Sequence, residues 1–230
     1  MDKKPDVLVK GICKTFNQGG EVLHVLRDVY FQATSGEIVM IVGPSGSGKT
    51  TLLSAIAGVL SIESGTIHLF DFPLHLKARH EIVNFRRKKI GFIFQQFHLI
   101  PTLTCGENVA IPLLLNGFTH AEALKEAYRS LEEVNLESKF KSFPKDLSGG
   151  QQQKVSIARA LIHKPSLIIC DEPTSALDAE SGIKIMNLIH SHVKMSNRVV
   201  IIVTHDSRIF KYADRIENMD DGRICDAKKL

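Results

Sequence analysis

The sequence predicts an α/β fold with a mainly parallel sheet, an N-terminal antiparallel β subdomain and an inserted α-helical subdomain. Residues 7–33 read as short apolar runs separated by the turn "NQGG", which is typical of an antiparallel hairpin. From "GEIVMIVG" onward, buried strands alternate with helical stretches, as in a parallel sheet covered on both faces. Residues 96–163 lack obvious buried strands, so we expect the helical subdomain there. Thr119 and Glu122 stand at capping-box spacing and predict the start of one of its helices.

Length and composition favour a single domain over residues 1–230, with the helical insertion at roughly 96–163. The 230 residues include 43% hydrophobic side chains, which is enough to bury a core, and they show no repeat and no linker. The net charge of +4 is mild and scattered, so it demands neither nucleic acid nor an anionic membrane. We therefore expect no nucleic-acid partner. The basic run "RRKK" reads as a solvated face, because no aromatic stacking platform accompanies it.

The four cysteines stand far apart without a CxxC pair, which argues against a zinc site or a disulfide framework and suits a reducing compartment. No segment approaches the roughly 18 apolar residues of a membrane helix, and "PDVLVKG" near the N-terminus does not resemble a signal peptide. The expected location is therefore cytoplasmic. Any work at a membrane would require another protein to hold this chain there.

The strongest local signal is "GPSGSGKT", which fits G-x-x-x-x-G-K-[ST] between an apolar strand and a helical stretch. A glycine-rich turn can aim backbone N–H groups at phosphate oxygens, and the helix N-terminus adds its positive dipole. Lys49 would reach the β- and γ-phosphates, and the Thr50 hydroxyl would bind Mg²⁺. The phosphate-binding residues predicted here are Gly43, Pro44, Ser45, Gly46, Ser47, Gly48, Lys49, Thr50 and Thr51.

A second signal is "LIICDEP", an apolar strand that ends in two carboxylates. Asp171 would stand beside the phosphate loop and hold Mg²⁺, commonly through water. Glu172 would then be free to orient an attacking water and accept its proton, so it is the candidate general base. Taken alone, these acids would read as solvated residues at a strand end. Together with the phosphate loop they predict a hydrolytic site.

Two further strand ends carry candidate polar groups. Gln95 follows "IGFIF" and could bind Mg²⁺ and sense the γ-phosphate, although a surface glutamine is the alternative. His205 follows "VVIIVT" at the edge where open α/β sheets gather their ligands. A structural histidine is the alternative to a phosphate-sensing role.

The stretch "LSGGQQQKVSIARAL" places two glycines at the start of a predicted helix. Ser148 and Gln151 form a capping-box pattern, which explains the helix start but not the glycines. Gly149 and Gly150 would each cost about 1 kcal/mol relative to alanine inside a helix. They also remove side chains from the helix start and let an anion approach its N–H groups. We interpret this element as a second phosphate-binding surface, which could act on the same molecule or on another one.

These motifs, together with "SALD" at residues 175–178, occur in the order and spacing of an ATP-binding cassette transporter ATPase, and the chain resembles that family over nearly its whole length. The resemblance implies a P-loop NTPase core of RecA type. It also implies ATP and Mg²⁺ as cofactors, and a head-to-tail homodimer with two ATP molecules at the interface. Each ATP would contact the phosphate loop of one subunit and the residues Ser148, Gly149, Gly150 and Gln151 of the other.

The same resemblance implies further roles. Phe16 is similar to the aromatic residue that stacks on adenine, with a buried core aromatic as the alternative. Asp178 resembles the carboxylate that communicates across the dimer. The implied catalytic residues are Glu172, His205 and Lys49, and the implied metal ligands are Thr50, Gln95 and Asp171.

The stretches "IGFIFQQFHLIPTLTCGENVAIPLLL" and "IVTHDSRIFKYADRIENMDDGRI" resemble the cassettes of lipoprotein-release, macrolide-export and heterocyst-type exporters. This resemblance implies a separate membrane permease that docks beside the segment after Gln95 and holds the chain on the cytoplasmic face of the inner (plasma) membrane. The sequence ends soon after "DGRI", so we expect no C-terminal regulatory domain.

Other functions remain open at this point. A cell-division cassette that regulates wall hydrolysis is not separated from an exporter. A soluble cassette of DNA repair or translation would need a coiled-coil insertion or a duplication, and neither is visible. A GTP-dependent switch would carry a guanine-reading N-K-x-D motif, which the sequence lacks.

Overall fold

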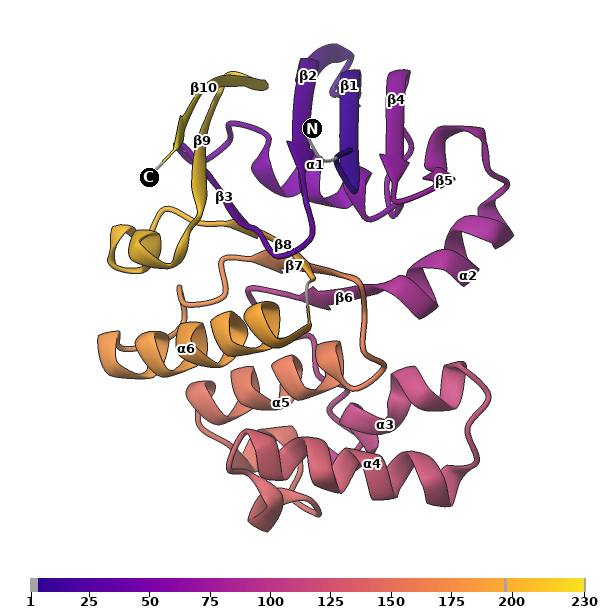
Figure 1. Ribbon diagram of the computed structural model, residues 1–230, viewed down its shortest axis with the longest axis vertical. Helices are drawn as coiled ribbons and strands as arrows, with labels where there is room; N and C mark the ends of the chain where they lie inside the picture. The colour runs from indigo at the N-terminus through magenta and orange to yellow at the C-terminus, as the bar shows by residue number, and fades with distance from the viewer. Residues whose placement is uncertain (1–3, 197, 230) are drawn as a thin grey trace.

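The computed structural model describes residues 4–196 and 198–229, which form two sheets and a group of helices (Figure 1). The first sheet is antiparallel and follows the order β2-β1-β4-β5. Its strands are β1 (Val7–Gln18), β2 (Glu21–Ala33), β4 (Ser64–Leu69) and β5 (Phe72–Pro73). This sheet confirms the antiparallel N-terminal subdomain that the apolar runs and the "NQGG" turn predict.

The second sheet has six strands in the order β10-β9-β3-β8-β7-β6. Every neighbouring pair from β9 to β6 is parallel, and only the β9–β10 hairpin is antiparallel. The strands are β3 (Ile38–Val42), β6 (Ile90–Ile93), β7 (Leu167–Asp171), β8 (Val199–Val203), β9 (Arg215–Asp220) and β10 (Arg223–Lys229). All residues of β3, β7 and β8 are buried, as expected for central strands with both faces covered. The mainly parallel sheet is therefore confirmed.

Helices α1 (Lys49–Ile56) and α2 (Arg79–Lys89) follow β3 and β5, and α6 (Ala179–Ser196) precedes β8. Between residues 94 and 166, all of which the structure describes, there is no strand. This segment holds α3 (Cys105–Leu115), α4 (His120–Glu133) and α5 (Gly149–Leu161), and Figure 1 shows them gathered at one end of the molecule. We call α3, α4 and α5 the helical lobe.

Each lobe helix begins at a hydroxyl residue that is followed three positions later by Glu or Gln. Thr119 and Glu122 cap α4 and Ser148 and Gln151 cap α5, both as the sequence predicts. Thr104 and Glu107 cap α3 in the same way, which the sequence analysis had not singled out. These reciprocal bonds satisfy N–H groups that the first turn of a helix leaves free.

Three hydrophobic clusters make up the core. One lies between the antiparallel sheet, α1 and one face of the parallel sheet, and a second covers the other face under α5 and α6. The third belongs to the helical lobe and includes the fully buried Val109, Ala127 and Leu131. The lobe thus packs around apolar side chains of its own and is joined to the sheet by α5, which contributes to both clusters.

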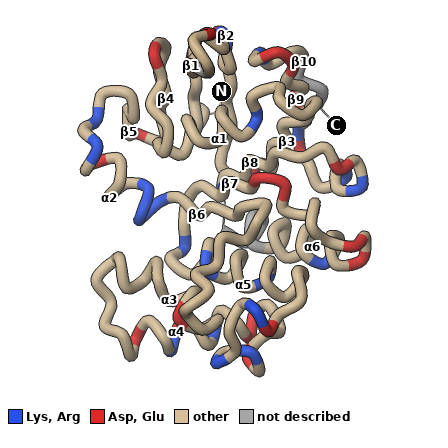
Figure 2. The backbone as a smooth tube through the Cα atoms, turned by 180° about the vertical axis from the view of Figure 1, so that it is seen from behind, with Lys and Arg blue, Asp and Glu red and all other residues tan. Residues whose placement is uncertain are grey.

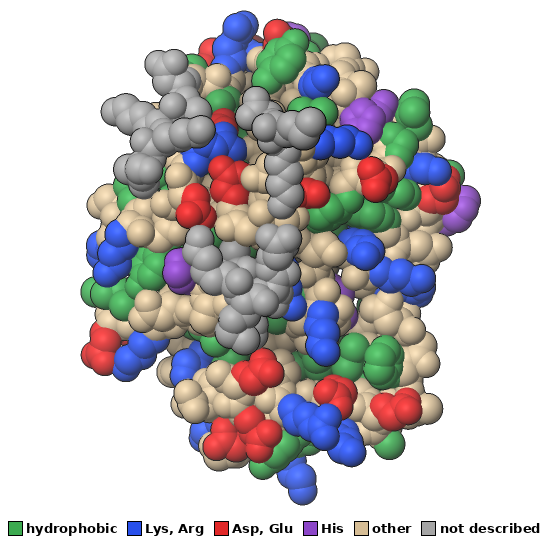
Figure 3. All heavy atoms as spheres, in the orientation of Figure 1, with side chains coloured by type: hydrophobic (Ala, Val, Ile, Leu, Met, Phe, Trp, Pro, Cys, Tyr) green, Lys and Arg blue, Asp and Glu red, His purple; other side chains and the backbone are tan. Residues whose placement is uncertain are grey.

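Charged side chains of both signs alternate on the face of the lobe that Figure 3 shows. Cys13, Cys105, Cys170 and Cys225 are all free thiols, in agreement with the absence of a predicted disulfide framework. None of the helices in the described ranges has the length and the apolar character that a bilayer span requires.

Candidate active site

The carboxyl ends of the parallel strands meet at one edge of the sheet and surround a cavity of about 620 Å³. Open α/β sheets bind ligands at this edge, because the loops that leave neighbouring strands diverge there. Most of the predicted site residues line the cavity, together with Val25 and Val203, which the sequence did not indicate. The predicted residues in the lining are Gly43, Pro44, Ser45, Gly46, Gly48, Lys49, Thr50, Thr51, Gln95, Asp171, Glu172 and His205.

The loop between β3 and α1 contains glycines at positions where neighbouring backbone leaves no room for a side chain. A β-carbon on Gly43 would lie 2.0 Å from the Met219 carbonyl oxygen, which is far inside contact distance. A β-carbon on Gly48 would lie 2.6 Å from the Val25 carbonyl oxygen, and the φ of +99° at Gly48 is itself unfavourable for other residues. Gly46 has a φ of +82° and open space where its β-carbon would be. This loop therefore presents bare backbone to the cavity.

Lys49 lies at the start of α1 and folds back into the loop. Its Nζ donates hydrogen bonds to the carbonyl oxygens of Gly43 at 2.9 Å and Pro44 at 2.7 Å, and to Ser47 Oγ at 3.3 Å. Burial lowers the pKa of Lys49, while the nearby carboxylates of Glu172 and Asp171 act in the opposite direction. The ammonium is therefore fixed at the cavity wall, between the loop and two acidic residues.

Thr50 and Asp171 join the loop to the end of β7. Thr50 Oγ1 donates a hydrogen bond to Asp171 Oδ1 at 3.2 Å. Burial raises the pKa of Asp171, Glu172 acts in the same direction, and the Thr50 hydroxyl and Lys49 oppose them. Figure 2 shows a red, acidic stretch of backbone beside the label of β7. A cation at this place would relieve the cost of two neighbouring carboxylates.

Glu172 follows β7 and is held in one position by three contacts. Its N–H donates to the Val203 carbonyl oxygen at 2.9 Å, Thr204 Oγ1 donates to Oε2 at 3.3 Å, and His205 Nδ1 lies 2.6 Å from Oε1. The backbone at Glu172 has a φ of 49°, a left-handed conformation that is uncommon for residues other than glycine. Strain of this kind persists where the surrounding structure fixes it, and functional sites are frequent locations.

Thr50, Gln95 and Asp171 line the same cavity, and hydroxyl, amide and carboxylate oxygens are ligands that suit Mg²⁺. In the described part of the chain, no group of three or more His, Cys, Asp or Glu residues could hold a metal ion. The residues present therefore fit a Mg²⁺ that takes its other ligands from water and from a nucleotide, as Mg²⁺ does in phosphate-transfer sites.

Four predicted elements lie outside the lining of this cavity. Phe16 in β1 is 40% exposed, with Lys14 Nζ 5.5 Å from its ring centre, so the alternative of a buried core aromatic is wrong. Ser47 is 4% exposed and lies behind the loop, where it bonds Lys49. The remaining two are the start of α5 at residues 148–151 and Asp178, which caps α6 by accepting the Ser181 N–H at 2.9 Å.

The start of α5 lies against the segment that contains Asp178. A β-carbon on Gly149 would come no closer than 3.7 Å to any atom, with the Ala176 carbonyl oxygen nearest, and on Gly150 no closer than 3.7 Å, with Ser181 Oγ nearest. These are ordinary van der Waals contacts, and neither residue has a positive φ. The described part of this chain therefore gives no steric reason for glycine at either position.

Sequence reasoning missed several residues that shape the site. Asp206 accepts hydrogen bonds from Thr174 Oγ1 at 2.9 Å and from Arg208 Nε at 2.7 Å, which ties the segment after Glu172 to the one after His205. Arg159 and Asn108 bind the carbonyl groups that follow Gln95. The partners of Arg159 lie 61 and 62 positions away and Thr174 lies 32 positions from Asp206, so no local pattern marks these contacts. Asn108 bonds carbonyl groups only four to eight positions away, but any residue can present a carbonyl. In the run "RRKK", Lys88 and Lys89 are exposed as a solvated face requires, whereas Arg86 and Arg87 are half-buried and line a groove, which corrects that interpretation for the two arginines.

Comparisons with known proteins agree with this geometry. The family model described as "ABC transporter" matches residues 26–175. HrtA of Staphylococcus aureus, a protein that carries the name hemin import ATP-binding protein, is 40% identical over 220 residues, 96% of this chain and 99% of its own length.

Two kinds of solved structure are similar as well. The ATP-binding cassette MJ0796, a dimer in a post-hydrolysis state bound to ADP and Pi, superposes with a TM-score of 0.92 at 38% identity, covering 97% of this chain and 98% of its own. CbiO1 of Clostridium perfringens, part of the ABC transporter complex cbiONQ, has a TM-score of 0.85 at 27% identity, covering 99% of this chain and 89% of its own. With its phosphate loop, its acidic pair and its fold, the chain belongs to the ATP-binding cassette (ABC) transporter family and is an ATP-hydrolysing nucleotide-binding subunit.

Proposed function

We propose that this chain works as a head-to-tail homodimer that ATP closes and hydrolysis reopens, and that it drives a separate membrane permease of the lipoprotein-release or macrolide-export type. The observation that carries the dimer is the start of α5, where Gly149 and Gly150 are not needed by the packing of their own chain. Bare N–H groups at a helix N-terminus suit a phosphate, and the partner subunit's ATP would supply one. A dimeric cassette at 38% identity supports this arrangement.

The ATP phosphates would lie in the cavity against the loop from Gly43 to Thr51. Lys49 would bind the β- and γ-phosphate oxygens from its place at the cavity wall. Mg²⁺, held by Thr50, Gln95 and Asp171, would neutralise the charge that develops on the phosphate oxygens. Phe16, which is exposed on the β1–β2 hairpin that also contributes Val25 to the cavity lining, would stack on the adenine ring.

Glu172 would act as the general base. Its carboxylate would accept a proton from water while the water oxygen bonds the γ-phosphorus and the bond to the bridging oxygen of ADP breaks. His205 Nδ1 lies 2.6 Å from Glu172 Oε1, and the His205 side chain is 70% exposed, so the imidazole would be free to contact the γ-phosphate. Asp178, at the start of α6 beside Gly149 and Gly150, would carry the state of one site to the other.

A groove between the sheet and the helical lobe offers a docking place for the permease. The groove has a volume of about 540 Å³, and we call it the apolar groove. Its apolar lining comes from α2, β6, α3 and α5 and from the segments that follow α1 and β6, and among the described residues no Asp or Glu side chain contributes to it. The apolar lining residues used in this argument are Val59, Val83, Phe92, Phe94, Pro112 and Leu115. A permease bound there would place the chain on the cytoplasmic face of the inner (plasma) membrane.

The identity to HrtA favours a second candidate, in which the permease moves hemin. That relative matches nearly the whole chain at 40% identity and carries hemin import in its name. The two candidates share one ATPase mechanism and differ only in the permease and its substrate. Growth on toxic hemin concentrations, with and without the chain and its permease, distinguishes them, since only the second candidate predicts a hemin-dependent difference.

The test of the proposed function is a pull-down of tagged Glu172→Gln chain with Mg-ATP from detergent-solubilised membranes of its own cell. The substitution should slow hydrolysis and keep the closed dimer on its partner. Recovery of a permease with few membrane helices and a large extracytoplasmic domain supports the proposal. Recovery of soluble proteins or nucleic acid alone contradicts it and favours a soluble cassette. A Lys49→Ala control should recover little permease, because nucleotide binding is weakened.

A further inference from the structure

We propose that Arg159 of α5 is a positioning residue that holds the segment after Gln95 in a strained conformation and so links the apolar groove to the metal-binding edge of the cavity. We call residues 94–104 the glutamine loop. The inference rests on the proposed function in one respect, namely that Gln95 is a metal ligand. The grip of Arg159 on the loop is a separate claim with its own readout.

The guanidinium of Arg159 binds two consecutive carbonyl groups of the glutamine loop. Nη1 donates to the His98 carbonyl oxygen at 2.6 Å and Nη2 donates to the Phe97 carbonyl oxygen at 2.7 Å. Both are short, charge-assisted bonds, and the rigid fork of arginine fixes the direction of the two carbonyls as well as their distance. A lysine at this position could donate to either carbonyl but could not match both with a planar fork.

Those two carbonyls belong to residues in an unfavourable backbone conformation. Phe97 has a φ of 55° and His98 a φ of 46°, so two successive non-glycine residues are left-handed. Such conformations persist only where neighbouring groups fix them. Within the loop, the Phe97 N–H bonds the Phe94 carbonyl oxygen at 3.4 Å and the His98 N–H bonds the Gln96 carbonyl oxygen. Arg159 is the charged group that opposes relaxation of this tight turn.

The far end of the glutamine loop is held separately. Asn108 of α3 is fully buried, and its Oδ1 accepts the Ile100 N–H at 2.8 Å. Its Nδ2 lies within hydrogen-bond distance of the carbonyl oxygens of Ile100, Leu103 and Thr104. The loop is thus fixed by one side chain at each end. Arg159 is the one near Gln95.

Arg159 also borders the apolar groove, where Phe94 and His98 of the glutamine loop line the wall beside it. In the described part of the chain no carboxylate lies within ion-pair distance of its guanidinium, so the two carbonyls are its charge-compensating partners there. Arg159 is half-buried, and this burial lowers the pKa of its guanidinium. Whatever enters the groove will contact this side chain and the loop together.

The same helix reaches the other half of the site. Gln153, 1% exposed, donates from Nε2 to the Pro173 carbonyl oxygen at 2.8 Å, next to Glu172. Helix α5 therefore begins with Gly149 and Gly150. It contacts the segment after Glu172 through Gln153, and it contacts the segment after Gln95 through Arg159. A displacement of the groove occupant would move the Gln95 side of the site relative to the Glu172 side through this helix.

The experiment compares Arg159→Met with Arg86→Met in the full chain. Arg86 is a matched control, because it lines the same groove and donates to a carbonyl, that of Gly58 at 3.2 Å, which lies outside the glutamine loop. The first readout is amide hydrogen exchange of residues 94–100 without nucleotide. We expect Arg159→Met to speed exchange there by roughly tenfold or more and Arg86→Met to leave it unchanged. Arg159→Lys should fall between, because one bond remains.

The second readout is the Mg²⁺ concentration that gives half-maximal ATPase activity. Arg159→Met should raise it several-fold, as Gln95→Ala should, while nucleotide affinity without Mg²⁺ stays within about twofold, since the phosphate loop is untouched. The double variant Arg159→Met/Gln95→Ala should shift the Mg²⁺ dependence no further than Gln95→Ala alone. A merely structural role would lower activity without moving the Mg²⁺ dependence.

The outcomes separate the two claims. If exchange in 94–100 is the same in Arg159→Met and Arg86→Met, the positioning role is overturned. If the loop loosens but Gln95→Ala leaves the Mg²⁺ dependence unchanged, the role of Gln95 is wrong and the grip of Arg159 stands. If Arg159→Met fails to fold, Arg159→Lys decides, because unchanged exchange in that variant overturns the proposal and local loosening supports it.

Discussion

The two glycine-bearing elements of this chain differ in what makes glycine necessary. In the loop from Gly43 to Gly48, a β-carbon would collide with backbone at 2.0 Å or 2.6 Å, so the fold of the chain itself excludes other residues. At Gly149 and Gly150 a β-carbon would meet nothing closer than 3.7 Å, and the helix would gain stability from alanine. The first element is built by its own chain, whereas we propose that the second is kept bare for something outside it.

This difference separates a structural requirement from a functional one. A residue that costs helix stability and meets no steric need in the described chain indicates selection by a ligand or a partner. The same contrast applies to the acids. Asp171 and Glu172 are buried next to each other at a cost, and that cost is reasonable if a cation and a reacting water are bound there.

The largest expected effect concerns Glu172, on which the proposed chemistry at the first element depends. Glu172→Gln keeps the shape and the contact with Thr204 but cannot accept a proton, so kcat should fall by roughly 10²–10⁴-fold with ATP affinity retained. A phosphate-release assay and an equilibrium nucleotide titration measure the two quantities. Hydrolysis at the parent rate would show that another group is the base.

The next largest effect, on stability and nucleotide binding, is expected at Gly43. Gly43→Ala would force the loop away from Met219 and should lower the free energy of unfolding by about 1–3 kcal/mol, the range for overpacked sites. Nucleotide binding should weaken with it. Urea denaturation followed by circular dichroism gives the free energy. An unchanged denaturation midpoint would mean that the loop adapts to the added methyl group and that glycine is not sterically required at this position.

The matching substitution at the second element should have the opposite effect on stability. Gly149→Asp places a carboxylate in the first turn of α5, where it should stabilise the helix by about 0.3–1 kcal/mol through the dipole. The same charge would repel the phosphates of a partner's ATP. We expect denaturant stability to hold or rise while ATPase activity collapses. Gly149→Ala serves as the uncharged control. Loss of stability in both variants would show that the fold does require glycine at this position.

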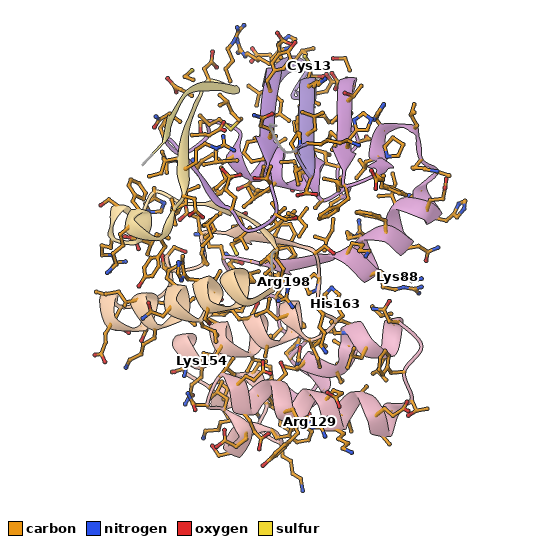
Figure 4. All side chains as sticks on the ribbon, viewed as in Figure 1. Cys13, Lys88, Arg129, Lys154, His163 and Arg198 are labelled. Carbon is orange, nitrogen blue, oxygen red and sulfur yellow. The ribbon has the colours of Figure 1, made fainter. Side chains whose placement is uncertain are left out.

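The smallest expected effect tests how the end of α5 is held to the sheet. His163 follows α5, its Nε2 lies 3.1 Å from the Ile90 carbonyl oxygen, and Figure 4 shows it between the lobe and the sheet, near Arg198. Burial, and secondarily the charge of Arg198, lowers the pKa of His163. The unfolded chain binds a proton near pH 6.5 and the folded chain only at lower pH, so stability is full above about 6.5 and is lost as pH falls.

His163→Gln can still donate to the Ile90 carbonyl oxygen but does not titrate. Between pH 7.5 and 5.5 its free energy of unfolding should therefore fall less than that of the parent chain. The difference between the two losses should be about 1 kcal/mol or less. Denaturant midpoints at the two pH values measure this. Equal losses in both proteins would show that the imidazole is not held neutral.

The sequence predicted the first element well because every part of it is local. The strand, the loop and the helix are contiguous, and the motif that joins them needs fixed residue types at fixed spacing. The cap of α5 was predictable for the same reason, since Ser148 and Gln151 are three residues apart. The antiparallel and parallel sheets followed from turn residues and from runs of buried residues.

The remainder depended on contacts between distant residues. Arg159 bonds carbonyl groups that lie 61 and 62 positions away, and any residue can present a carbonyl, so no pattern reveals the pair. Phe16 could have been a core residue on sequence grounds, and its 40% exposure follows from its place on the hairpin. The half-burial of Arg86 and Arg87 was not predictable, because residues distant in sequence lie beside them: Arg86 Nη1 donates to the Gly58 carbonyl oxygen, and Pro112 and Leu115 line the same groove.

The central claim is that ATP joins two copies of this chain through the bare start of α5. The most direct test is the mass in solution, measured by light scattering, of Glu172→Gln with Mg-ATP, alone and combined with Gly149→Asp. The account predicts a dimer for the single variant and an ATP-bound monomer for the combined one. A single variant that binds ATP and remains a monomer, or a combined variant that still dimerises with ATP, would contradict it.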